Sequence, residues 1–220
     1  IAPDMPIDTA VGRFILGKSL NAGQTCVAPD YVLCPRDKVA SLITAVKKQF
    51  NIMYPSLDSN ADYSSIINES QLSRLKAWLE DAESKGASVH KTSEVAVANK
   101  MPLTMLTEVS DDMTVMQEEI FGPLLPILPY DNIEDAIQYI NDRPRPLALY
   151  LFSFDKSLQD SVLKQTHAGG VCINDAAVHV AMDDLPFGGV GPSGMGQYHG
   201  KEGFLTFSKA KSVFSKGKVS

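Results

Sequence analysis

Apolar residues recur along this chain at two spacings, which predict two kinds of element. Apolar residues three or four positions apart indicate helices with one buried face, whereas short unbroken apolar runs indicate buried strands. The segments with helical spacing are 8–20, 37–50, 69–85, 133–140 and 157–165. The strand-like runs are 31–34, 103–109, 124–130, 147–152 and 170–173.

The order of these segments predicts the fold class. Beyond residue 100, strand-like and helical segments alternate, which is typical of an α/β layer fold with a mostly parallel sheet. At the helix ends, Asp8 is expected to cap the first helix, with Leu20 on its apolar face, and Gly86 to end the third. Residues 55–64 are expected to form a polar loop.

Composition narrows the range of partners. The 220 residues are 44% hydrophobic, which is enough for a packed core, and carry a formal net charge of −6. Nucleic acids and anionic membranes bind clustered positive charge, so neither is an expected partner. The longest apolar runs are much shorter than the roughly 18 residues that suggest a membrane span, so no membrane association is expected.

The three cysteines form no disulfide framework, because their number is odd and small. A reduced, cytoplasmic protein is therefore expected. The sequence has no C-x-x-C pair and no His-rich tract, so no metal site is expected. Cys34 and Cys172 lie inside apolar strand-like runs and are interpreted as small buried residues.

Cys26 stands in a different setting, after Gly23 and Gln24 at the boundary between a helix and a loop. A thiolate in such a loop can attack a carbonyl carbon, and its own backbone N–H can stabilise the oxyanion that forms. The alternative is that Cys26 only fills space. A Cys–His hydrolase is a further alternative, in which His167 or His199 would act as the base.

Two further patterns in the sequence have both a functional and a simpler structural explanation. Residues 189–194 fit G-x-G-x-x-G, but no strand precedes them and glycines and a proline interrupt any following helix, so a dinucleotide-binding turn is rejected. Glu119 and Phe121 precede a Gly-Pro turn. They form either a solvated helix end or a site where a carboxylate binds sugar hydroxyls beside an aromatic ring.

Four ordered motifs resemble the aldehyde dehydrogenase superfamily over essentially the whole chain. They are Asn21-Ala-Gly-Gln-Thr-Cys26, Glu119-Ile-Phe121-Gly-Pro, Gly169-Gly-Val-Cys-Ile-Asn174 and the glycine loop 186–196. The segment Ala-Pro-Asp-Tyr31 and the residues from Tyr198 to Ser208 are similar to the class 3 branch. Within that branch, the sequence as a whole most resembles the bacterial coniferyl aldehyde dehydrogenases.

The resemblance implies a three-layer α/β/α catalytic domain and a set of roles. Cys26 is the implied nucleophile in the NAD- or NADP-dependent oxidation of an aldehyde to an acid through a thioester. Glu119 and Phe121 are the implied cofactor-binding residues, and Asn21 and Asn174 are implied to lie near the substrate and the oxyanion. The implied substrate is coniferyl aldehyde, with a fatty or aliphatic aldehyde as the alternative.

The resemblance also implies that the chain is the carboxyl-terminal part of a longer, homodimeric enzyme. The family's general-base glutamate lies in a Glu-Leu-Gly-Gly-Lys motif, which is expected upstream of this segment together with most of the cofactor site. Residues 1–196 are expected to form the thiol-bearing catalytic domain. Residues 197–220 are expected to return to the cofactor and oligomerisation region. Alternatively, this piece alone is a scaffold with at most residual thiol esterase activity.

Overall fold

The computed structural model describes residues 1–95, 97 and 99–218, and these form an α/β fold, as the sequence predicted. The α-helices are α1 (Ile7–Ser19), α2 (Val39–Met53), α3 (Glu69–Ser84), α4 (Ile133–Asn141), α5 (Lys156–Gln165) and α6 (Gly200–Thr206). The strands are β1 (Val32–Pro35), β2 (Ser88–Lys91), β3 (Thr104–Thr107), β4 (Leu124–Tyr130), β5 (Ala148–Leu151) and β6 (Gly170–Ile173).

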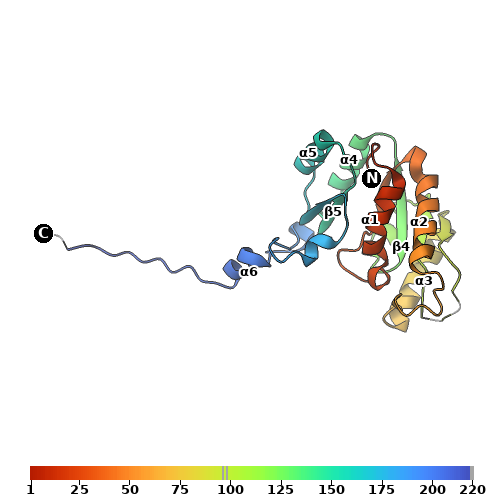
Figure 1. The fold of residues 1–220 in the computed structure, drawn as a ribbon, viewed down its shortest axis with the longest axis horizontal. Coiled ribbons are helices and arrows are strands. Elements are labelled where there is room, and N and C mark those ends of the chain that lie inside the picture. The colour runs from red at the N-terminus through yellow and green to blue at the C-terminus, as the bar shows by residue number, and fades with distance from the viewer. Residues whose placement is uncertain (96, 98, 219–220) are drawn as a thin grey trace.

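The larger sheet has four strands in the order β1-β4-β3-β2, with α1 and α2 side by side along it (Figure 1). Strand β4 is parallel to both β1 and β3, and only β2 is antiparallel to its neighbour. Strand β4 contains two prolines, yet it lies inside the sheet. Pairing with β3 covers residues 124–126 and pairing with β1 covers 127–130, so each proline borders only one partner strand and its missing N–H is tolerated.

A second, two-stranded sheet pairs β5 with β6 in parallel, with Leu149 opposite Val171. Its apolar side chains pack with α4 and α5 in a small cluster that includes Ile137 and Val162. The main core lies around the larger sheet. Phe14 of α1 meets the ring of Phe152 edge-on just after β5, with ring centroids 6.1 Å apart, which joins the two parts.

All ten expected helices and strands are confirmed, with each end within three residues of its expected position. Some details differ, for local reasons. Asp8 does not cap α1, because the helix begins at Ile7 and its N-cap is Pro6, and Leu20 is 55% exposed rather than buried. Strand β2 and helix α6 were not expected, since neither shows a clear apolar period. Gly86 does end α3, with φ 101°.

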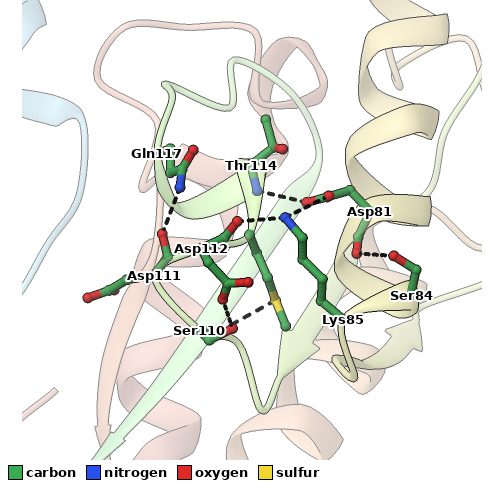
Figure 2. A network of polar contacts seen from close by, with 9 residues as sticks. Asp81, Ser84, Lys85, Ser110, Asp111, Asp112, Thr114 and Gln117 are labelled. Atoms are coloured by element: carbon green, nitrogen blue, oxygen red, sulfur yellow. Dashed lines mark hydrogen bonds and ion pairs between the residues drawn. The ribbon is translucent and has the colours of Figure 1, made fainter.

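A polar network attaches the end of α3 to the segment that leads towards residue 119 (Figure 2). Asp81 accepts a hydrogen bond from the Thr114 amide at 2.8 Å and forms an ion pair with Lys85, also at 2.8 Å. Lys85 in turn donates to the carbonyl of Asp112 at 2.6 Å. These polar bonds hold together two segments that are distant in the sequence.

The carboxyl-terminal segment extends away from the rest of the chain (Figure 1). After α6, residues 207–218 are exposed throughout. Among the helices that the structure describes, none combines the length and the apolar character that crossing a membrane would require.

Candidate functional site

Cys26 follows a backbone segment of unusual conformation. Asn21, Ala22 and Gly23 all have left-handed backbone angles, with φ of 51°, 54° and 73°. Asparagine and glycine adopt this region readily, whereas Ala22 does so at a cost of about 1–2 kcal/mol. Ala22 is fully buried, and its packing helps to offset that cost. The chain therefore leaves α1 in a tight reversal, and Cys26 is exposed just beyond it.

Gln24 anchors this reversal to another part of the molecule. Its side-chain amide donates to the carbonyls of Asn21 and Ser65, at 2.9 Å and 3.1 Å, and its side-chain oxygen accepts from the Ile67 amide at 2.9 Å. The Asn21 side chain donates back to the Gln24 carbonyl at 3.0 Å. These bonds fix the backbone immediately before Cys26.

Cys26 lies on a cavity of about 530 Å³ between the two sheets. The cavity also contains Glu119 and Phe121, so the structure brings together three of the five residues that the sequence singled out. Phe121 is 42% exposed, and its backbone is left-handed with φ 46°. Aromatic side chains make up part of the remaining wall, namely Phe14, Tyr31, Tyr150 and Phe152.

The peptide backbone between Glu119 and Phe121 is held from two sides. Asp30, four residues after Cys26, accepts a hydrogen bond from the Ile120 amide at 3.1 Å. Arg74 of α3 donates to the Ile120 carbonyl at 2.7 Å and stacks on Trp78, with its guanidinium carbon 4.3 Å from the ring centroid. The thiol loop and α3 together therefore fix the orientation of the 119–121 segment.

Charges beside the cavity perturb one another. Partial burial, together with the nearby Asp30 carboxylate, raises the pKa of Glu119, and the Arg74 guanidinium partly opposes this. Burial likewise raises the pKa of Asp30, against the effects of Lys18, the Ile120 amide and Arg74. Lys18 is buried within α1, and desolvation lowers its pKa to about 8 although Asp30 favours the charged form.

Asn21 and Asn174 lie outside the cavity wall, and both side chains bond to backbone. The amide of Asn21 is used within the reversal described above. Asn174 has φ 61°, and its side-chain oxygen accepts from the Ser153 amide at 2.9 Å. Its carbonyl accepts from Arg13 of α1 at 2.9 Å. In this arrangement Asn174 links the end of β6 to β5 and α1.

The other thiols and the histidines give no support to a Cys–His hydrolase. Neither His167 nor His199 lines the cavity with Cys26. Cys34 is buried, as expected. Cys172 is also buried, with its sulfur 3.2 Å from Nδ1 of His179. Burial raises the pKa of Cys172 and lowers that of His179, so this pair stays neutral and its thiol is a poor nucleophile.

Two other sequence interpretations concern the glycine loop and metal binding. Residues 189–194 contain a short 3-10 turn over Gly191–Ser193 rather than a strand followed by a helix, in agreement with the rejection of a dinucleotide-binding turn. Within the residues that the structure describes, no cluster of three or more His, Cys, Asp or Glu side chains could hold a metal ion.

Sequence reasoning gave no role to Asp30, Arg74, Lys18 or Tyr150. Asp30 belongs to the Ala-Pro-Asp-Tyr31 segment and follows Cys26 by four residues, so the local sequence is enough to place it near Cys26. Arg74 reaches Ile120 across 46 positions, and Tyr150 reaches the Cys26 loop across 123. No periodicity or local motif encodes contacts at such separations.

Two glycines offer a matched test of the thiol loop. A Cβ at Gly23 would lie 2.4 Å from the Gly122 carbonyl oxygen, in a left-handed backbone, whereas a Cβ at Gly12 of α1 would meet nothing within 4 Å. Gly23→Ala should lower the free energy of unfolding by more than about 2 kcal/mol. Gly12→Ala should raise it by about 0.5–1 kcal/mol, because alanine favours the helix. Urea unfolding measures both, and a Gly23→Ala protein as stable as the parent would contradict the close approach.

The buried amine of Lys18 predicts a pH dependence of stability. Its pKa is about 8 in the folded state and 10.5 for a free side chain, so the folded protein binds fewer protons between these values and becomes more stable as the pH rises. Below pH 8 the full penalty, at most about 3 kcal/mol, is present. Lys18→Met removes this ionisation. The stability difference between Lys18→Met and the parent should therefore shift in favour of the parent from pH 8 to 10.5, as measured by urea unfolding.

Gly12→Ala provides the control for this experiment, because it changes no ionisable group. Its stability difference from the parent should stay constant over the same pH range. If the stability difference between Lys18→Met and the parent is also constant, folding does not lower the pKa of Lys18.

Comparisons with protein families and with individual proteins both identify aldehyde dehydrogenases as similar to this chain. The model of the aldehyde dehydrogenase family matches residues 1–213. The chain is 57% identical over 216 residues to a probable coniferyl aldehyde dehydrogenase of Pseudomonas aeruginosa, covering 98% of the chain and 45% of that protein. It is 43% identical to aldehyde dehydrogenase family 3 member A2 of Rattus norvegicus, covering 97% of the chain and 44% of that protein.

A solved structure shares the fold over the full chain. It is the substrate-bound state of Staphylococcus aureus AldH, with a TM-score of 0.92 and 40% sequence identity, covering 100% of this chain and 48% of that one. The chain thus spans somewhat less than half the length of the proteins it matches. From the family match and these likenesses together, the chain belongs to the aldehyde dehydrogenase family.

Proposed function

We propose that the protein containing this chain oxidises an aldehyde to the carboxylic acid with NAD(P)+, and that Cys26 is the nucleophile. The observation that carries the proposal is the single cavity shared by Cys26, Glu119 and Phe121. Cys26 is the exposed thiol of the three, and family membership gives the reaction class.

The chemistry follows from the reactivity of a thiolate. The sulfur of Cys26 bonds to the aldehyde carbon, and negative charge develops on the carbonyl oxygen. Among the described residues, nothing accepts a hydrogen bond from the backbone N–H of Cys26, so this donor is free for that oxygen. Glu119 and Phe121 would hold NAD(P)+ beside Cys26, where it would supply the oxidant that takes up the hydride of the former aldehyde carbon. Water then attacks the resulting thioester, the C–S bond breaks, and the acid and the thiolate are released.

The residues around the cavity fit a nicotinamide cofactor. The carboxylate of Glu119 can accept hydrogen bonds from the paired hydroxyls of a ribose, and the exposed ring of Phe121 offers a flat apolar surface. Asp30 and Arg74 hold the backbone between them. Asn21 and Asn174 are proposed to act near the substrate by shaping the segments on either side of the cavity.

For the substrate, we propose an aromatic phenylpropenal such as coniferyl aldehyde. Two observations support it, namely the aromatic rings on the cavity wall and the name of the Pseudomonas aeruginosa relative. An aliphatic aldehyde is the alternative, because the same apolar wall would also accommodate an alkyl chain.

The cysteines and the exposed aromatic residues lead to proposals for the cellular location and the oligomeric state. Three unpaired cysteines favour the reducing cytoplasm. The 197–220 segment exposes Phe204, Phe207 and Phe214 by 72%, 88% and 90%. Such apolar exposure favours burial against another part of the assembly, in line with a homodimer whose carboxyl-terminal segment returns to the cofactor region. Residues 1–196 would then form the thiol-bearing domain.

The decisive experiment measures aldehyde-dependent NADH or NADPH formation by the whole protein. Cys26→Ala should reduce kcat by on the order of 10³-fold or more, because no other group forms the thioester. Cys34→Ala, which alters a buried thiol, should leave the rate within about twofold of the parent value. A Cys26→Ala protein with the parent rate would disprove the assignment of the nucleophile.

The same assay separates the alternatives. A higher kcat/KM for decanal than for coniferyl aldehyde would favour the aliphatic substrate. The alternative that this piece is only a scaffold is tested with the 220-residue chain alone. That alternative is considered because the chain covers only 45% of a relative. Cys26-dependent hydrolysis of an activated ester without NADH formation from an aldehyde would identify the chain as an incomplete enzyme with residual esterase activity.

Alkylation by iodoacetamide distinguishes the three thiols directly. Burial raises the pKa of Cys34 to about 11 and also raises that of Cys172, so both thiolates are scarce at pH 8. Cys26 should therefore be labelled faster than either by about tenfold or more, as read by peptide mass spectrometry. Equal labelling rates would contradict its assignment as the accessible, reactive thiol.

A further inference from the structure

A side chain from a distant strand holds the turn that carries Cys26. Tyr150 of β5 lines the cavity, and its hydroxyl donates a hydrogen bond to the Val27 carbonyl at 2.6 Å. The two residues are 123 positions apart, and Val27 directly follows Cys26. The bond therefore ties the Cys26 loop to the smaller sheet.

One peptide group is restrained at both of its polar ends. The carbonyl of Val27 and the amide of Ala28 belong to the same planar unit. The carbonyl accepts from Tyr150, and the amide donates to the Thr25 carbonyl at 3.0 Å, which closes a turn around Cys26. If this plane rotates, the turn opens, and the direction of the Cys26 side chain changes with it.

Tyr150 is itself packed against Cys172 and His179. In the β5–β6 pair it stands opposite Cys172, whose sulfur contacts His179 at 3.2 Å. The His179 ring meets the Tyr150 ring edge-on, with centroids 5.9 Å apart. Gly170 leaves room for that histidine, since a Cβ there would lie 2.9 Å from it. Burial raises the pKa of Tyr150, so its hydroxyl remains a proton donor.

We propose that Tyr150 is a positioning residue for Cys26. The Tyr150 hydroxyl fixes the Val27–Ala28 peptide and so directs the Cys26 sulfur into the cavity. This rests on the proposed function, because the sulfur is the reacting atom of that function. Displacing a reacting atom slows the chemical step far more than it weakens binding, so Tyr150 should act on kcat.

Another tyrosine provides a matched control. The hydroxyl of Tyr63 donates to the Met101 carbonyl at 2.9 Å, and the residue is buried against Phe50 and Tyr54, away from the cavity. Tyr150→Phe and Tyr63→Phe each remove one hydroxyl that bonds to a backbone carbonyl and leave the ring in place. Any difference between them at Cys26 therefore reflects position rather than the loss of a hydrogen bond as such.

The test has two measurements on the intact protein. Hydrogen exchange of the Ala28 amide should become faster in Tyr150→Phe by on the order of fivefold, as expected for the loss of one hydrogen bond, and should not change in Tyr63→Phe. In the aldehyde assay, Tyr150→Phe should lower kcat by roughly tenfold with KM within about twofold of the parent, while Tyr63→Phe keeps both values.

Each outcome is informative. Unchanged Ala28 exchange in Tyr150→Phe, an equal change in both variants, or a parent-like kcat would overturn the positioning role. If Cys26→Ala retains activity, the proposed nucleophile fails, yet the exchange measurement still tests whether Tyr150 holds the turn. The two failures are therefore distinguishable.

Discussion

The close approach of two backbone segments at Gly23 and Gly122 is the constraint on which the candidate site depends. A side chain at Gly23 would collide with the Gly122 carbonyl oxygen, and one at Gly122 would collide with Leu75 of α3. Because neither glycine has a side chain, the thiol loop, the 119–122 segment and α3 meet in one place. Cys26 and the pair Glu119 and Phe121, nearly a hundred residues apart in the chain, thereby share a cavity.

Polar contacts then make this meeting specific. The side chain of Asp30 in the thiol loop accepts a hydrogen bond from the Ile120 amide, and the side chain of Arg74 in α3 donates one to the Ile120 carbonyl. Apolar packing alone would bring these segments together without fixing their orientation, because it is not directional. The hydrogen bonds supply the direction, and they also place the Asp30 carboxylate beside Glu119. Partial burial, with this carboxylate as the second cause, raises the pKa of Glu119.

The strain around Cys26 is supported from several elements. Three consecutive left-handed residues are unfavourable in isolation, but Gln24 ties them to residues 65–67 and Tyr150 ties the following turn to β5. These hydrogen bonds fix the backbone on both sides of Cys26 and leave its side chain exposed.

The sequence by itself determined the α/β class, nearly all of the helices and strands, the burial of Cys34 and Cys172, and the likeness to the aldehyde dehydrogenase family. These depend on local periodicity and on ordered motifs, which are properties of neighbouring residues. Only the tertiary structure decided that Cys26, Glu119 and Phe121 share a cavity, that Asn21 and Asn174 bond to backbone beside it, and that Asp30, Arg74 and Tyr150 support it. Apart from the bond between Asn21 and Gln24, which spans three positions, these contacts join residues far apart in the chain. They form only once the sheets and helices have packed, so no local pattern encodes them.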